Sequence, residues 1–255
     1  MKDLLRLSIV SYSNTIPFNY GLRKLLGTQL NLSISEDIPA ECARKLLQKE
    51  ADIGLVPVVM LPHLPDYKVA TDYCIGADGP VASVILFSTV SLDKIEKIYL
   101  DYQSRTSVEL VKILSRAYWK ITPVFLNTKE GYEDNLAEGE AALIIGDRAL
   151  DRLENYSFSW DLSQEWKSFT GMPFVFAVWC FKKDLNDEVE KIFNTLFSYS
   201  VKHIKEAVKF FHTKSKSNLD EDIKKISYLS ENISYHLDEE KKIALRHFLK
   251  LCSEN

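Results

Sequence analysis

Two short polar segments of the chain carry groups suited to holding a small anion. "SYSNT" (residues 11–15) supplies hydroxyls and an amide, whereas "SRTS" (residues 104–107) supplies hydroxyls and a guanidinium. Each segment follows an apolar run and precedes an amphipathic run, which predicts a turn from a strand into a helix. The first turn of a helix presents unpaired N–H groups and about half a positive charge. We therefore expect two anion sites, which together suit a small molecule with two carboxylates if they face each other across a cleft.

A third segment, "GADGPVAS" (residues 76–83), places flexible backbone and a serine directly before the apolar run "VILF". Glycine allows the backbone to approach a ligand closely. We expect residues 81–88 to form a strand that carries the chain from one lobe into another, with Ser83 pointing into the cleft. An ordinary Gly-Pro turn would explain the same residues.

The binding candidates come from these turns and from the turn that ends the apolar run "AALII". A simpler interpretation is that the Ser, Thr and Asn side chains only cap their helices. It also stays open whether the arginine of the second segment grips a carboxylate or braces its turn. The candidate substrate-binding residues are Ser11, Ser13, Thr15, Gly79, Ser104, Arg105, Thr106, Ser107, Gly146 and Asp147.

A general base is harder to assign from the sequence. Asp78, Asp101 and Asp147 lie near predicted strand ends, and a base must come within hydrogen-bonding reach of its proton. Each aspartate also has a structural explanation, in a turn, at a strand end or as a helix cap. The five histidines show no metal-ligand spacing and the four cysteines form no CxxC pair, so we expect neither a metal site nor a disulfide.

The elements around these turns predict an α/β fold. Short apolar runs alternate with amphipathic stretches from residue 4 to about residue 60 and again from about residue 89 to residue 145, including a helix in "GYEDNLAEGE". Aligning Thr15 with Thr106 matches strand, polar turn and helix in the two halves, although such a short match also arises by chance. With a return segment at residues 170–181, we expect one lobe from residues 1–88 and 175–255 and a second from residues 89–174.

Composition restricts the partners. The 255 residues include 46% hydrophobic and 27% charged residues, and the net charge is -4. That charge gives no general attraction to nucleic acid or to an anionic membrane. The apolar stretches are shorter than the roughly 20 residues of a membrane helix. The N-terminal residues lack the apolar core of a signal peptide, so we expect a cytoplasmic protein.

Several segments in order along nearly the whole chain resemble one family, the chorismate dehydratases of the futalosine route to menaquinone. The segments that carry this resemblance are "VSYSNTIPF", "CARKLLQKEADIGLVPVV", "DYCIGADGPVASVILFS", "YLDYQSRTSVELVK", "EAALIIGDRAL", "DLSQEWKSFTGMPFVFAVW" and "YLSENISYHLDEEKKIALRHF". The resemblance implies the fold of type II periplasmic binding proteins, with two lobes, two hinge strands and a cleft between the lobes.

The resemblance also implies a reaction and its residues. Family members eliminate water from chorismate to give 3-[(1-carboxyvinyl)oxy]benzoate without a metal or an organic cofactor. Asn14 and Ser83 match the active-site Asn and Ser of the family, whereas Ser13 stands where many members have an apolar residue. The resemblance further suggests that the enolpyruvyl carboxylate of the substrate itself takes the proton.

Two other functions fit a cleft of this kind. One is a cytoplasmic protein that binds or senses a small dicarboxylate. The other is the related enzyme 1,4-dihydroxy-6-naphthoate synthase of the same pathway, for which we expect a catalytic histidine in the cleft. Only His63 lies near a predicted strand end, which disfavours the synthase. The oligomeric state is left open by the sequence.

Overall fold

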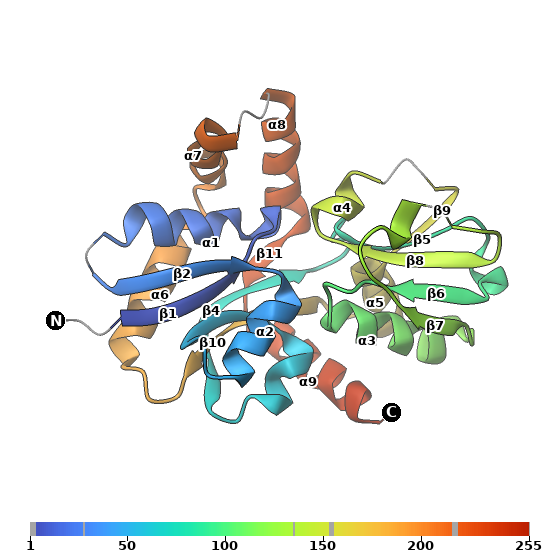
Figure 1. The fold of residues 1–255 in the computed structure, drawn as a ribbon, viewed down its shortest axis with the longest axis horizontal. Helices are drawn as coiled ribbons and strands as arrows, with labels where there is room; N and C mark the ends of the chain where they lie inside the picture. Colours follow the sequence, from blue (N-terminus) through green and yellow to red (C-terminus); the bar gives the residue numbers. More distant parts are fainter. Residues whose placement is uncertain (1–3, 28, 135, 153–155, 216–218, 255) are drawn as a thin grey trace.

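Two β-sheets lie side by side, each covered by helices (Figure 1). The structure is a computed structural model that describes residues 4–27, 29–134, 136–152, 156–215 and 219–254. We call the six-stranded sheet with its helices the first lobe and the five-stranded sheet with its helices the second lobe. The strand orders are β11-β4-β10-β3-β1-β2 in the first lobe and β7-β6-β8-β5-β9 in the second.

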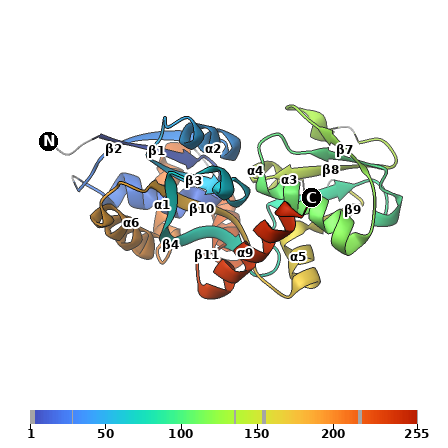
Figure 2. The ribbon, with the colours of Figure 1, turned by 90° about the horizontal axis from the view of Figure 1, so that it is seen from below.

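The first lobe is built from both ends of the chain. Its strands are β1 (Leu4–Val10), β2 (Asn31–Asp37), β3 (Ile53–Pro57), β4 (Tyr67–Ala77), β10 (Phe174–Lys182) and β11 (Ser234–His236). Its helices are α1 (Ile16–Tyr20), α2 (Pro39–Leu47), α6 (Asp187–Ser200), α7 (Ile204–Ser215), α8 (Leu219–Ser227) and α9 (Glu239–Ser253). Figure 2 shows α9 running from β11 towards α3 of the second lobe, with which it is in contact.

The second lobe is built from one continuous stretch. Its strands are β5 (Val84–Ser88), β6 (Lys97–Leu100), β7 (Val124–Asn127), β8 (Glu140–Ile145) and β9 (Phe158–Asp161). Its helices are α3 (Thr106–Ile113), α4 (Asp147–Leu150) and α5 (Leu162–Thr170). Pi-helical turns continue α1 through Gly21–Leu25 and α3 through Leu114–Trp119, and short 3-10 turns occupy Ser13–Thr15, Val58–His63, Leu92–Lys94 and Tyr132–Asp134.

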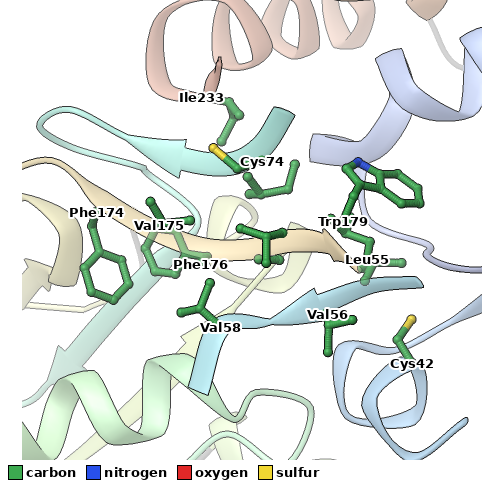
Figure 3. Packing of buried hydrophobic residues seen from close by; sticks show 14 of the residues in the cluster. Cys42, Leu55, Val56, Val58, Cys74, Phe174, Val175, Phe176, Trp179 and Ile233 are labelled. Atoms are coloured by element: carbon green, nitrogen blue, oxygen red, sulfur yellow. The ribbon is translucent and has the colours of Figure 1, made fainter. Parts of the chain in front are cut away.

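The core of the first lobe lies on both faces of the central strand β10. Apolar side chains of β10 pack against those of β3, as Figure 3 shows for Phe176, Trp179, Leu55 and Val56. Burying such a side chain contributes about 1.5–3 kcal/mol. Because β10 pairs with both β3 and β4, this strand joins the N-terminal part of the lobe to its C-terminal part.

The two sheets share one strand order. Strands β1 and β6 each lie between two parallel neighbours. On one side of them, β3 and β8 each pair with an antiparallel strand, which in turn pairs antiparallel with one further strand. The order β2-β1-β3-β10-β4 thus corresponds to β7-β6-β8-β5-β9. The similarity seen between the two halves of the sequence has a counterpart in the topology, because β1 and β6 occupy equivalent places.

The chain crosses between the sheets twice, between β4 and β5 and between α5 and β10. The predicted strand at residues 81–88 is shorter, since β5 begins at Val84 and pairs only within the five-stranded sheet. The exact division of the chain into residues 1–88, 89–174 and 175–255 stays a prediction.

The predicted helix in "GYEDNLAEGE" is wrong within the described residues. A 3-10 turn occupies Tyr132–Asp134, and Gly131 and Gly139, on either side, have positive φ angles of 89° and 80°. The Tyr132 hydroxyl donates to the Asp101 carboxylate at 3.0 Å and to the backbone of β8. The positive φ angles exclude an α-helix at Gly131 and Gly139, and the bonds of Tyr132 hold the turn between them in place.

Candidate functional site

A small cavity of about 60 Å³ lies where the two lobes meet. Its walls come from the carboxyl ends of β1, β3 and β8, from the start of α3 and from the bend before β5. This is where open α/β sheets bind ligands. The residues that line it are Val10, Tyr12, Asn14, Thr15, Pro39, Leu55, Pro57, Ile75, Val81, Ser83, Val84, Ser104, Thr106, Ser107, Ile145, Gly146, Phe176 and Ala177.

Asn14 is held at the cavity by the turn that follows β1. The Thr15 hydroxyl donates to the carbonyls of Val10 at 2.7 Å and Tyr12 at 2.8 Å, and the Tyr235 hydroxyl donates to the Asn14 carbonyl at 2.9 Å. The side-chain oxygen Oδ1 of Asn14 is buried and has no hydrogen-bond partner. Such an orphaned acceptor is uncommon in a folded protein and requires an explanation.

Ser83 reaches the same cavity from the crossing between the lobes. Its side chain is buried, and its Oγ accepts a hydrogen bond of 2.8 Å from the hydroxyl of Tyr228. Its carbonyl accepts from the Gly146 N–H at 2.8 Å. The preceding Ala82 has a φ of 60° and donates its N–H to the Asp161 carboxylate at 2.7 Å. Burial raises the pKa of Asp161, and the hydrogen bonds that its carboxylate accepts from backbone N–H groups oppose this shift.

The start of α3 forms the opposite wall. The Ser107 N–H donates to Ser104 Oγ at 3.1 Å, and the Thr106 hydroxyl donates to the Phe176 carbonyl of β10 at 3.1 Å. All three hydroxyl residues are buried and line the cavity. The N-terminal dipole of α3 therefore adds positive potential to a cavity wall that already carries hydroxyls.

Contacts across the cavity tie the two lobes together. The Tyr12 hydroxyl donates to Gln103, and the Ser13 N–H donates to both carboxylate oxygens of Asp147 at 3.3 Å. Burial raises the pKa of Asp147, although its hydrogen bonds with Ser13 act in the opposite direction. Gly146 has a φ of 68° and lies beneath the Tyr12 ring. The residues around the β1 turn thus contact the end of β8 directly.

The structure brings some of the predicted residues to the cavity and places others outside it. Asn14, Thr15, Ser83, Ser104, Thr106, Ser107 and Gly146 line the cavity. Ser13 and Asp147 bond to each other between the lobes but do not line it. Ser11 is exposed and bonds to the Asp37 carbonyl, and Gly79 lies beside Gln164.

Arg105 is exposed and faces a wider cleft of about 750 Å³, which we call the outer cleft. His63 also lines the outer cleft, and Ser104 lines both the cavity and the outer cleft. Arg105 and Ser104 diverge because consecutive residues entering a helix project about 100° apart around its axis. The outer cleft therefore lies directly beside the smaller cavity.

No residue that lines the cavity, within the described part of the chain, carries an acidic, basic or imidazole side chain. Asp78 pairs with Lys167 at 2.5 Å on the surface. Asp101 is buried, and its Oδ2 accepts hydrogen bonds from Arg148 at 2.6 Å and from the Ile145 N–H at 3.0 Å. Its Oδ1 accepts from the Gln103 N–H at 2.8 Å, so both oxygens are occupied. Neither carboxylate is placed to take a proton from a ligand in the cavity.

The described residues contain no group of three or more His, Cys, Asp or Glu side chains arranged to hold a metal ion. In that same part of the chain, every helix is too short or too polar to cross a bilayer.

Sequence reasoning missed three tyrosines of the site. Tyr12 stands inside "SYSNT", so its position between two predicted candidates was an available signal. Tyr228 and Tyr235 bond to Ser83 and Asn14 from more than 140 residues away in the chain. No local pattern could have paired them with the cavity.

Comparison with known proteins gives the relatives of this chain. The chorismate dehydratase of Thermus thermophilus is 29% identical over 197 residues, which is 70% of each chain. The chorismate dehydratase of Campylobacter jejuni is 27% identical over 250 residues, which is 95% of each chain.

Solved structures give the fold. A protein of Archaeoglobus fulgidus superposes with a TM-score of 0.74 at 16% identity and covers 98% of this chain and 97% of its own. The periplasmic aliphatic sulphonate binding protein of Escherichia coli superposes with a TM-score of 0.65 at 13% identity and covers 100% of this chain and 93% of its own. The predicted two-lobed α/β fold of periplasmic binding proteins is thereby confirmed. Residues 5–254 match the family described as menaquinone biosynthesis, and the chain belongs to that family.

Proposed function

We propose that this protein is a chorismate dehydratase, which eliminates water from chorismate to give 3-[(1-carboxyvinyl)oxy]benzoate. The observation that carries the proposal is the pairing of two groups in one small cavity. The orphaned acceptor Asn14 Oδ1 and the hydroxyl of Ser83 both lie in the wall of that cavity. The two relatives named as chorismate dehydratases support the same reaction.

The cavity suits the charge of chorismate without a charged side chain. Chorismate carries one carboxylate on its ring and one on its enolpyruvyl ether. We assign the ring carboxylate to the start of α3, where the helix dipole and the hydroxyls of Ser104 and Ser107 lie. Negative charge develops on this carboxylate as the reaction proceeds, and fixed donors in a water-poor site stabilise such charge strongly.

The leaving hydroxyl group of the substrate matches Asn14 and Ser83. Its oxygen accepts a hydrogen bond from Ser83, and its proton is donated to Asn14 Oδ1. The hydrogen bond donated by Ser83 supports the departure of hydroxide. The bond accepted by Asn14 Oδ1 orients the leaving group and gives the orphaned oxygen its missing partner. Neither side chain has to act as an acid or a base.

The proton is taken from the carbon that carries the ether. Because the described lining of the cavity holds no acidic or imidazole side chain, we assign this step to the enolpyruvyl carboxylate of the substrate. The electron pair of the broken C–H bond enters the diene conjugated with the ring carboxylate. The C–O bond to the hydroxyl then breaks, the ring becomes aromatic, and the hydroxide and the abstracted proton leave as water.

Substrate binding requires the lobes to separate. A cavity of about 60 Å³ is smaller than the roughly 300–1,000 Å³ of ligand pockets. Opening breaks the hydrogen bonds of Tyr12 with Gln103 and of Ser13 with Asp147, and closure around chorismate restores them. The outer cleft beside Ser104 is the side from which chorismate approaches.

The test is turnover of chorismate by purified, chelator-treated protein, followed by chromatography with mass detection. We expect an aromatic product one water lighter than chorismate. Asn14→Ala and Ser83→Ala each lower kcat by about 100-fold or more, as loss of a preoriented hydrogen-bond partner of the reacting group does. Ser11→Ala is the matched control, because Ser11 is exposed and lies outside the cavity.

Three outcomes separate the alternatives. Tight binding of chorismate without turnover would instead assign the protein to ligand sensing. Equal turnover by all four proteins would refute the placement of the site. A chorismate analogue with a neutral group in place of the enolpyruvyl carboxylate should bind without reacting, and its conversion would exclude this carboxylate as the base. The futalosine route and the cytoplasmic location stay predictions from the sequence.

A further inference from the structure

Tyr228 is a third side chain of the site, in direct contact with Ser83. It opens the π-helical turn Tyr228–Asn232 between α8 and β11, and it is buried. Its hydroxyl donates to Ser83 Oγ at 2.8 Å. Turns of this wide type inside helices are rare and frequently occur at functional sites.

The direction of this hydrogen bond determines what Ser83 offers to the cavity. A serine hydroxyl has one proton and two lone pairs, so Ser83 keeps its own proton for another acceptor when Tyr228 fills one lone pair. Asn14 Oδ1, in the wall of the same cavity, is the orphaned acceptor. Tyr228 thus leaves Ser83 with a free donor beside this free acceptor.

Tyr228 keeps its proton while it does so. Burial raises the pKa of Tyr228, and the negative charges of Asp147 and Asp161 raise it further, whereas the bond to Ser83 opposes the shift. A phenol in this state is a hydrogen-bond donor and not a base. Its contribution is therefore to orient Ser83.

We propose that Tyr228 is a positioning residue of the dehydratase, which aims the Ser83 hydroxyl at the leaving hydroxyl of the substrate. This role rests on the proposed function. It assigns to Tyr228 an effect on the chemical step rather than on the affinity for chorismate, because Tyr228 acts through a residue that holds the leaving group.

The test is a double-mutant cycle on kcat with chorismate. We expect Tyr228→Phe to lower kcat by about 10-fold to 100-fold, the range seen when a partner that orients a reacting group is removed. KM should change by less than about 3-fold, because the contacts that bind substrate and transition state equally well are unchanged. In Ser83→Ala the same replacement should then have almost no further effect, because coupled residues are not additive. Tyr67→Phe is the matched control, since the buried Tyr67 hydroxyl donates at 2.7 Å to the Ala51 carbonyl away from the cavity.

Two results would overturn the role of Tyr228. The first is a full multiplicative loss in the double variant, which would make the two residues independent. The second is a rise in KM with unchanged kcat, which would make Tyr228 a binding residue. A wild-type protein that leaves chorismate unchanged refutes the proposed function and this role together, whereas either of the two results with an active wild type refutes the role alone.

A second variant covers the case in which Tyr228→Phe does not fold. Replacement of Tyr228 by 2,3,5-trifluorotyrosine keeps the hydroxyl and the packing but makes the phenol more acidic. Because the donor must be protonated, we expect the alkaline decline of kcat to begin at a lower pH than in the wild type. An unshifted pH profile would contradict the role.

Discussion

Gly146 has an unusual backbone conformation and contacts both the Tyr12 ring and the backbone of Ser83. Its φ of 68° and ψ of -149° fall in a region that residues with a side chain avoid. A Cβ atom at this position would lie 3.2 Å from three atoms of the Tyr12 ring, which is closer than ordinary contact. The Gly146 N–H also donates to the Ser83 carbonyl. Gly146→Ala therefore perturbs the fold and the site at once.

Two effects lower the free energy of unfolding of Gly146→Ala. Backbone strain of this kind costs about 1–3 kcal/mol, and forcing an extra carbon into a packed site costs about 1–3 kcal/mol more. The matched control is Gly171→Ala, because Gly171 also has a positive φ, 74°, but has no atom within 4 Å of the added carbon. Strain alone should cost that variant about 1–2 kcal/mol.

The assay is the thermal unfolding midpoint together with kcat/KM for chorismate. For a chain of this size each kcal/mol lowers the midpoint by about 2–4 °C. We expect Gly146→Ala to lose roughly 4–24 °C and Gly171→Ala roughly 2–8 °C. Activity should fall by about 10-fold or more only in Gly146→Ala, since a misplacement of about 1 Å costs about 100-fold. Equal midpoints and equal activities of the two variants would refute this account of the β8 turn.

Three other predictions follow from single contacts. The raised pKa of Asp147 favours its protonated form in the folded wild type, so the folded state loses stability as pH rises from the ordinary pKa of Asp through the raised one. Asp147→Asn should remove that loss and raise the unfolding midpoint at pH 7. A lower midpoint would contradict the sign. Arg105→Ala should raise KM for chorismate a few-fold at low salt and leave kcat unchanged, because an exposed charge in the outer cleft acts by steering; an effect that persists at about 1 M salt, where the screening length is about 3 Å, would mean direct contact. Thr106→Val removes the buried donor to the Phe176 carbonyl and should cost about 1–3 kcal/mol in urea unfolding, and a variant as stable as the wild type would show that this bond between α3 and β10 contributes nothing.

Local patterns predicted the elements and much of the cavity wall. The polar turns after β1 and β6 were found because hydrophobic period and helix starts are local properties of the sequence. For the same reason Thr15, Ser104 and Ser107 were predicted together with their helices, and the structure places all three at one cavity. The roles assigned to Asn14 and Ser83 came from the family resemblance and remain to be measured.

The rest depends on contacts distant in sequence. Tyr228 reaches Ser83 only because the π-helical turn at Tyr228–Asn232 and the pairing of β11 with β4 bring the C-terminal segment back over the crossing. The direction of Arg105 depends on the angle at which the chain enters α3, which the pattern of hydroxyls around it does not determine. Side-chain direction at a turn and long-range return of the chain are both tertiary properties.

The central position of β10 has a consequence for how the protein is made. While the ribosome synthesises the chain, β3 and β4 emerge early, but the strand that must lie between them ends only at Lys182. At about 5–20 residues per second, β3 and β4 wait roughly 5–20 s with unpaired edges, and in that time the continuous second lobe can complete its sheet. Unpaired strand edges promote aggregation. The second lobe can therefore fold before the first lobe, although the first lobe begins the chain. Nascent chains that stop before β10 should be the species that chaperones bind.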